Sequence, residues 1–327
     1  MNRRSLLIAG ALAPLSARAQ LFGGRQMKVG MLFGYSAADP FSRLCLAAFR
    51  TGLATRGWEE GGNFALQVRW AEGDPQRAMD LAKELVSQGP DLIVSNSTPA
   101  TEAVLRQTRT IPVVFVVVSD PVGSGFVKTL AHPGGNATGL INVESSLAEK
   151  WIELLAQVAP KIKRAGVMYN PKTAPYAEYY LPRLNAAAAR LGITPFITTV
   201  TSGRDIEDAV LELGRDRTTG LVVMVDSFML INRKIVIAAA ARRRVPAIYF
   251  TSDWTMEGGL MSYGVDNVEL FRRAAVYVDR ILKGAKPAEL PVEQPTKFEL
   301  YINATTAKAL KLPIPQTLLL RADKVVE

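Results

Sequence analysis

Small polar side chains follow six short apolar runs in this sequence, and they are the residues best suited to bind a ligand. In open α/β sheets, ligands bind outside the carboxyl ends of the strands, so the positions directly after each run matter most. The six segments are 34–36, 96–99, 119–121, 169–171, 226–227 and 251–254. Hydroxyl, amide and carboxylate groups at these positions, each beside an expected helix start, favour binding of a small polar solute.

The two ends of a zwitterionic ligand have separate candidate partners. Ser97-Thr98-Pro99 predicts a hydroxyl N-cap followed by proline in the first helical turn, which leaves backbone N–H groups free to bind a carboxylate. Asp120 and Asp226 are candidate partners for a ligand ammonium group. Structural alternatives stay open, because Ser97 or Thr98 can simply cap its own helix. Asp120 can equally be a turn residue and Asp226 a helix cap.

Aromatic residues stand beside these polar segments. Tyr35, Tyr169, Tyr176 and Trp254 could form flat apolar walls around a ligand, although aromatic side chains more often pack in a core. Trp254 follows Asp253 in a predicted loop, so we expect it to depart from that tendency. The predicted ligand contacts are Tyr35, Ser36, Ser97, Thr98, Ser119, Asp120, Asn170, Tyr176, Asp226, Asp253 and Trp254.

Residues for catalysis or metal binding are scarce. The single histidine, His132, is predicted to end a helix, and the single cysteine, Cys45, to be a buried apolar residue on one. One imidazole excludes the HExxH type of zinc site. The segment 123–129 resembles a phosphate loop but lacks the glycine before its lysine, and no GxSxG elbow is present. We expect no enzyme, cofactor or metal, while a secreted α/β enzyme using carboxylate or serine–lysine chemistry remains an alternative.

The first nineteen residues predict an export signal. Asn2-Arg3-Arg4 supplies a positive start, residues 6–15 form an apolar stretch, and Ala17-Arg18-Ala19 fits a cleavage site. About ten apolar residues are too few to cross a membrane, which takes about twenty. No other stretch is long enough, so we expect a free periplasmic protein that is not inserted in the membrane.

Positive charge does not by itself indicate a nucleic-acid partner here. The 327 residues include 39 Lys and Arg against 30 Asp and Glu, a net charge of +9. Cleavage after Ala19 removes three arginines and lowers the net charge to +6. The run at 242–244 ends a predicted helix, where cations interact favourably with the helix dipole. Without a helix-turn-helix pattern, we expect no binding of nucleic acid.

Apolar runs alternate with stretches of helical period, which predicts parallel βαβ units. Strands are predicted at 29–33, 66–70, 92–94, 113–118 and 138–142, then at 165–169, 194–200, 221–225, 247–250, 260–261 and 298–302. Helices are predicted near 41–56, 76–88, 99–107, 123–131, 146–158, 176–191, 205–215, 229–243, 267–283 and 305–310. The cycle starts twice, so two sheets of like architecture are expected.

Several longer strings resemble one known family. They are SDPVGSG at 119–125, PGGNATGL at 133–140, GGLMSYG at 258–264 and LPVEQPTKFE at 290–299, with WAEG at 70–73 and AIY at 247–249. In this order, over nearly the whole mature chain, they resemble the ABC-transporter substrate-binding family with TrpX-type members. Residues 36–40 depart from the small Gly/Ser-rich segment that the family often shows there.

The resemblance implies a type I periplasmic binding protein, in which two doubly wound parallel-sheet lobes joined by a three-crossover hinge close on a ligand. It implies an ABC importer component, a monomer that captures an amino acid or an aromatic or carboxylate compound. The closed form would dock on a membrane permease driven by a separate ATPase. Some relatives bind tryptophan or other aromatic amino acids. A ligand-presenting sensory protein is the main alternative, because the same fold serves receptors.

With this fold, the element order places lobe one at 26–142 plus 265–284 and lobe two at 143–264 plus 285–327. The ligand is expected in the cleft between them. Ser97, Thr98, Ser119 and Asp120 would form the first wall of the cleft, and the contacts from lobe two would close over the ligand only when it bridges both halves.

Overall fold

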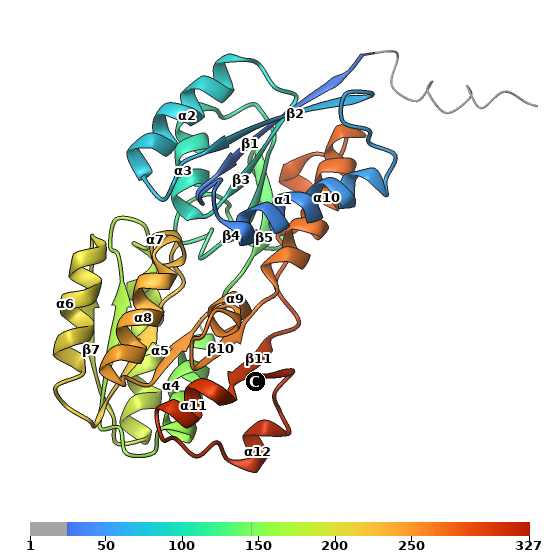
Figure 1. Cartoon of the computed structure of the whole chain (residues 1–327). Coiled ribbons are helices and arrows are strands. Elements are labelled where there is room, and N and C mark those ends of the chain that lie inside the picture. The colour runs from blue at the N-terminus through green and yellow to red at the C-terminus, as the bar shows by residue number, and fades with distance from the viewer. Residues whose placement is uncertain (1–24, 145) are drawn as a thin grey trace, which may run out of the picture.

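Two α/β lobes, each built on its own sheet, make up the computed structural model, which describes residues 25–144 and 146–327 (Figure 1). The predicted export signal at 1–19 lies outside the described residues. No helix in these ranges is long and apolar enough to span a membrane.

The sheet of lobe one has five parallel strands in the order β2-β1-β3-β4-β5. Its strands are β1 (Met27–Phe33), β2 (Phe64–Trp70), β3 (Leu92–Asn96), β4 (Val113–Val118) and β5 (Ala137–Ile141). Strands β3, β4 and β5 are buried along their whole length. Near-continuous apolar strands are expected where helices cover both faces of a parallel sheet.

Helices cover both faces of this sheet. The helices of lobe one are α1 (Pro40–Ala54), α2 (Pro75–Ser87), α3 (Thr98–Gln107) and the late α10 (Asn267–Leu282). α1 packs with α10 in one hydrophobic core, and α2 packs with α3 in another. Figure 1 shows α10 beside α1 although more than 200 residues of chain separate them. The late helix therefore completes lobe one.

Lobe two repeats the strand order of lobe one. Its seven strands are β6 (Arg164–Tyr169), β7 (Thr194–Thr199), β8 (Thr219–Val223), β9 (Ala247–Tyr249), β10 (Met261–Gly264), β11 (Glu299–Asn303) and β12 (Lys324–Val326). The order β7-β6-β8-β9-β10 matches β2-β1-β3-β4-β5, and β11 then pairs antiparallel with β10. Its helices are α4 (Leu147–Val158), α5 (Ala177–Arg190), α6 (Gly203–Leu213), α7 (Ser227–Ile231), α8 (Arg233–Arg243), α9 (Ser252–Met256), α11 (Ala304–Ala309) and α12 (Gln316–Leu319).

The chain crosses between the lobes three times: after β5, before α10, and beyond the short 3-10 helix η2 (Pro287–Glu289). The third crossing comes later than the predicted boundary at 285. The Ile141 N–H donates to the Glu293 carbonyl at 3.0 Å, and the Thr138 hydroxyl donates to the Leu290 carbonyl at 2.6 Å. Residues 287–293 therefore continue along the edge of lobe one before the chain reaches β11.

Three local predictions are wrong. The helix predicted at 123–131 is a series of turns, so His132 does not end a helix. Glycines in this segment and a hydrogen bond from the Gly123 N–H to the Asp120 carboxylate at 2.8 Å favour turns over a helix. The helix predicted at 229–243 is divided at Asn232 into α7 and α8. Asp253 and Trp254 lie in α9 rather than in a loop.

Gly52 sets the distance between α1 and α10. A Cβ at this position would lie 2.7 Å from the Arg272 carbonyl oxygen and 2.8 Å from the Ala275 Cβ. Alanine is a better helix former than glycine by about 1 kcal/mol, yet backbone cannot move aside as a flexible side chain can. We expect Gly52→Ala to lower the free energy of unfolding in urea by about 1–3 kcal/mol.

Thr51→Ala is the control for this substitution, because Thr51 is exposed on the same helix. It should change the unfolding free energy by less than about 0.5 kcal/mol. A Gly52→Ala protein more stable than the wild type would show that α10 does not pack this closely on α1.

Candidate functional site

The strand orders fix where a ligand can bind. In lobe one β1 lies between β2 and β3, and in lobe two β6 lies between β7 and β8. At such a switch point, the connections leave the two neighbouring strand ends toward opposite faces of the sheet and open a crevice. Residues following β1, β3, β6 and β8 therefore form the candidate site. The predicted segments at 34–36, 96–99, 169–171 and 226–227 all lie at these ends.

Hydroxyl groups link the strand ends of lobe one. The Thr98 hydroxyl accepts a hydrogen bond from the Ser119 N–H at 3.2 Å, and the Ser119 hydroxyl donates to Asn142 Oδ1 at 3.1 Å. Ser97 makes no side-chain cap on α3, and its buried hydroxyl has no hydrogen-bond partner among the described residues. Because Ser97 does not cap its own helix, its hydroxyl remains available to a ligand.

Backbone strain gathers at the same strand ends. Glu72, Ser97, Val117 and Asp120 have φ angles of 55°, 77°, 59° and 46°, and they are four of the six non-glycine residues with positive φ in the described ranges. Valine is especially unsuited to this region because its side chain branches at Cβ. Val117 lies at a register shift between β4 and β5. Strain of this kind persists where surrounding structure enforces it, and it concentrates at functional sites.

Tyrosines from both lobes meet at these ends. Tyr35 is buried after β1 beside the Asn96 side chain, and burial raises the pKa of its phenol. Tyr176 donates its hydroxyl to the Val225 carbonyl at 2.9 Å and lies beside the Ser119 hydroxyl of lobe one, while burial raises its pKa well above the usual range. Both phenols therefore stay neutral and act as hydrogen-bonding groups. Tyr176 brings lobe two against the wall built by lobe one.

The Asp226 carboxylate is already hydrogen-bonded by groups of lobe two. Its carboxylate accepts the Asn170 N–H at 2.7 Å and the Phe228 N–H at 2.8 Å, and it also accepts the Thr173 hydroxyl. Asp226 is therefore a helix cap, and Asp120 is a turn residue, as the structural alternatives from the sequence proposed. Burial raises the pKa of Asp226 to about 6, against these hydrogen bonds, which lower it.

Two further predicted contacts serve local turns. The Ser36 hydroxyl accepts the Ala38 N–H at 3.2 Å, and Asn170 Oδ1 accepts the Lys172 N–H at 2.9 Å. These hydrogen bonds hold both side chains in their own turns. Among the described residues, no hydrogen bond joins either side chain to Tyr35.

Asp253 is the carboxylate that the fold leaves without donors. Its side chain is only 9% exposed, and neither carboxylate oxygen has a hydrogen-bond partner in residues 25–144 and 146–327. The nearest cation is Arg233, whose Nε lies 3.4 Å away. Burial raises the pKa of Asp253 to about 6, and the positive charge of Arg233 partly offsets this rise. Asp253 also raises the pKa of Tyr35, which places the carboxylate near the switch point of lobe one.

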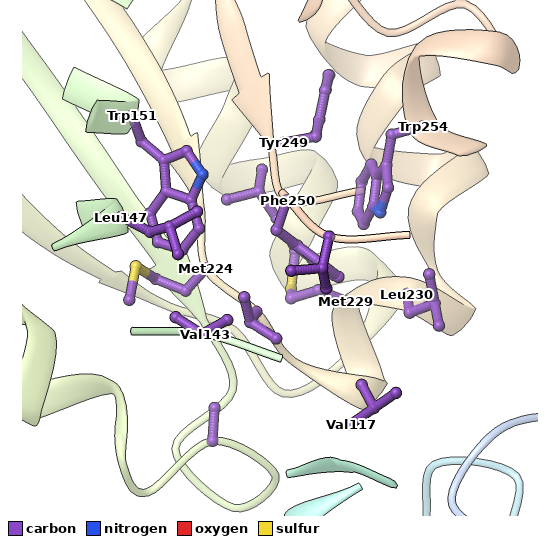
Figure 2. Packing of buried hydrophobic residues seen from close by; sticks show 14 of the residues in the cluster. Val117, Val143, Leu147, Trp151, Met224, Met229, Leu230, Tyr249, Phe250 and Trp254 are labelled. Atoms are coloured by element: carbon purple, nitrogen blue, oxygen red, sulfur yellow. The ribbon is translucent and has the colours of Figure 1, made fainter. Parts of the chain in front are cut away.

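Trp254 is part of the core rather than an exposed wall. Its ring is fully buried, stacks on Tyr249 with centroids 4.7 Å apart, and meets Phe250 edge-on at 5.4 Å. Figure 2 shows the indole above Met229 and Leu230 of α7. The indole Nε1 has no acceptor within the described chain, although a buried indole N–H normally has one.

Arg233 joins the two lobes and was missed from the sequence. Its guanidinium donates to both carboxylate oxygens of Asp39 in lobe one, at 2.7 and 2.9 Å, and to Glu257 Oε1 at 2.6 and 3.0 Å. The residue is 3% exposed. One signal was present: Arg233 precedes Val236, Ile237 and Ala240 at helical spacing, which places it on the apolar face of α8.

These groups can bind a small zwitterion. They offer a buried carboxylate, unpaired hydroxyl and indole groups, and aromatic surface from both lobes. The described residues include no group of three or more His, Cys, Asp or Glu side chains placed to hold a metal ion.

The raised pKa of Asp226 predicts a pH-dependent stability. Its folded pKa of about 6 exceeds the ordinary value of an unfolded aspartate, so its contribution is complete below about pH 4 and is lost as the pH rises through 6. Relative to the isosteric Asp226→Asn variant, the wild type should lose about 2–3 kcal/mol of unfolding free energy between pH 4 and pH 7. Urea unfolding at several pH values measures this difference.

Asp205→Asn is the control of opposite sign. Hydrogen bonds from Thr201 and Ser202 lower the pKa of Asp205, so its contribution is lost as the pH falls. Parallel stability curves for the wild type and Asp226→Asn would contradict the assignment of a raised pKa to Asp226.

The chain is similar to known amino-acid-binding proteins. The chain is 28% identical over 264 residues to a tyrosine-binding protein of Clostridioides difficile, covering 81% of this chain and 75% of that protein. The solved structure of an ABC domain from Streptococcus pneumoniae in complex with L-Trp is 27% identical and superposes with a TM-score of 0.85, covering 92% of this chain and 100% of that one.

Another solved structure superposes less well on this chain. The ligand-free, open structure of a substrate-binding protein from Clostridium difficile is 26% identical, covers 92% of this chain and 99% of its own, and has a TM-score of 0.66. At nearly equal identity, the present structure resembles the tryptophan complex more closely. The model of the family described as ABC transporter substrate binding protein matches residues 43–326. With its two parallel sheets in the periplasmic binding protein fold, the chain belongs to the family of ABC transporter substrate-binding proteins.

Proposed function

We propose that the protein binds an aromatic L-amino acid between its lobes and presents it, in the closed form, to an ABC permease. The observation that carries this proposal is the buried Asp253 carboxylate, which has no hydrogen-bond donor in the described chain. The ammonium group of an amino acid supplies such donors. Relatives with named aromatic ligands, tyrosine in one and L-Trp in another, support the choice of ligand class.

Charge balance supports a cationic group next to Asp253. Three carboxylates, those of Asp39, Asp253 and Glu257, surround the single guanidinium of Arg233. Glu257 is partly exposed, whereas the side chains of Asp39 and Asp253 are more than nine-tenths buried. Buried charges are stable only when they are paired, so the closed site has a surplus of negative charge that a ligand ammonium group would neutralise.

Other groups of the site suit the remaining parts of an amino acid. The unpaired Ser97 hydroxyl and the N-terminal end of α3 suit its carboxylate. Tyr35 and Tyr176 offer aromatic surface, and the Trp254 N–H offers a donor for a polar group on the ring or backbone of the ligand.

Binding and release, rather than a chemical step, would be the function. A ligand that bridges Asp253 in lobe two and Ser97 in lobe one would stabilise the closed arrangement. A permease with its ATPase would recognise that arrangement and accept the ligand. The export signal predicted at 1–19 supports a periplasmic location for this activity.

A ligand panel in thermal unfolding tests the proposed function. At about one hundred times its Kd, a ligand adds about 2.7 kcal/mol of stability, which raises Tm visibly. L-Tyr or L-Trp should produce this rise. Their analogues without the amino group should not, because Asp253 would remain without a cation. A rise with sugars alone, or an equal rise with the deaminated analogues, would contradict the proposal.

Substitution of Asp253 tests its role directly. Hydrogen bonds to charged groups contribute about 1.5–3 kcal/mol, so Asp253→Asn should weaken binding of the aromatic amino acid by about 10- to 100-fold in calorimetry. In the wild type, affinity should fall as the pH drops through about 6, because protonation neutralises Asp253. The variant should lack this dependence.

Asp216→Asn, at a partly exposed position of lobe two, is the matched control and should leave the affinity unchanged. The charged neighbours Arg233 and Glu257 are the same in both variants. Wild-type affinity and pH dependence in Asp253→Asn would remove this residue from the ligand site.

A further inference from the structure

All five N–H donors of the Arg233 guanidinium are used in this structure. Nε donates to Glu257, one terminal nitrogen donates to Asp39 and to the Leu230 carbonyl at 3.1 Å, and the other donates to Asp39 and Glu257. A guanidinium has five N–H donors, so none is left for Asp253. This explains why the Asp253 carboxylate, although 3.4 Å from Nε, has no hydrogen bond to it.

Asp39 is the member of this cluster that comes from lobe one. Arg233 and Leu230 lie on α8 and α7, and Glu257 and Asp253 lie on or next to α9, all in lobe two. The contacts within lobe two therefore move together as a unit when the lobes separate. The Asp39 contact is different, because 194 residues of chain and the cleft lie between its two partners. It forms only when the lobes are closed.

We infer that Asp39 is a positioning residue that couples closure to ligand binding. When the lobes close, Asp39 accepts hydrogen bonds from Arg233. The Asp253 carboxylate is then free to bind the cationic group of the ligand. When Asp39 withdraws, two guanidinium donors lose their acceptors. The Asp253 carboxylate lies 3.4 Å from Nε of the same guanidinium, so a small rotation of Arg233 would bring a freed donor to it, and the open cleft would present a neutralised Asp253. Closure exchanges this internal partner for Asp39. The coupling between Asp39 and ligand binding at Asp253 rests on the proposed function. The ion pair between Asp39 and Arg233 does not.

Asp39→Ser removes the ion pair with Arg233 but keeps the second role of Asp39, which is to cap α1. The Asp39 carboxylate also caps α1, accepting the Phe41 N–H at 3.1 Å. Serine is about as good an N-cap as aspartate, so the helix start is kept, while the short neutral side chain cannot form the two-pronged contact with Arg233. Glu60→Gln is the matched control. It removes a similar two-pronged pair, Arg50 to Glu60 at 2.7 and 3.0 Å, that lies within lobe one.

Small-angle scattering of the ligand-free protein tests the ion pair between the lobes. Asp39→Ser should increase the radius of gyration relative to the wild type, because the closed form loses a buried contact, and Glu60→Gln should not. Equal radii for the wild type and Asp39→Ser would overturn the inference. This comparison stands even when no aromatic amino acid proves to be the ligand, so failure of the proposed function is recognised separately.

Ligand kinetics test the coupling to Asp253. Loss of one partner of a buried charge pair acts mainly on dissociation, so Asp39→Ser should release L-Tyr or L-Trp at least about tenfold faster, with unchanged release from Glu60→Gln. In the Asp253→Asn background the same substitution should have a smaller effect, because no carboxylate remains to compete for Arg233. Additive effects of the two substitutions would overturn the coupling.

Discussion

A charge removed from water must find a partner, and this constraint determines how the cleft is organised. The guanidinium of Arg233 satisfies it completely, with five donors on acceptors from both lobes. Asp253, in the same buried region, does not satisfy it. Its raised pKa expresses the cost of keeping that carboxylate ionised without donors. In the proposed function, a ligand that supplies a cation would remove this cost.

The fold brings this constraint to the right place by repetition. Each lobe uses the same strand order, so each has a crevice at the carboxyl ends of its central strands. Lobe one contributes hydroxyl groups at strained backbone, those of Ser97 and of Ser119 beside Asp120, while lobe two contributes charge, at Asp253 and Arg233. Neither half of the site is complete by itself. In the proposed function, a ligand would gain its full set of contacts only from the closed arrangement, so closure would report binding.

The sequence predicts the strands well because the central strands of a parallel sheet are buried on both faces and read as continuous apolar runs. It also predicts which strand ends carry polar groups. It does not predict which carboxylate is free. Asp120 and Asp226 look as suitable as Asp253, yet the N–H groups of a local turn and a local helix start bind the first two, and Asp226 also accepts the distant Asn170 N–H. The pairing of Asp39 with Arg233 is harder still, because 194 residues separate them and no local pattern links them.

The energetics of that pair suit a protein that must open again. Removing two charges from water costs nearly as much as their attraction returns, so the net contribution of a complete buried pair to closure is small. Loss of a single partner is much more costly, because the other charge stays buried and unpaired. In this protein Asp253 provides Arg233 with a second partner when Asp39 leaves. Opening therefore does not leave an unpaired guanidinium, and the lobes can exchange between two arrangements of similar free energy that a ligand of modest differential affinity is able to shift.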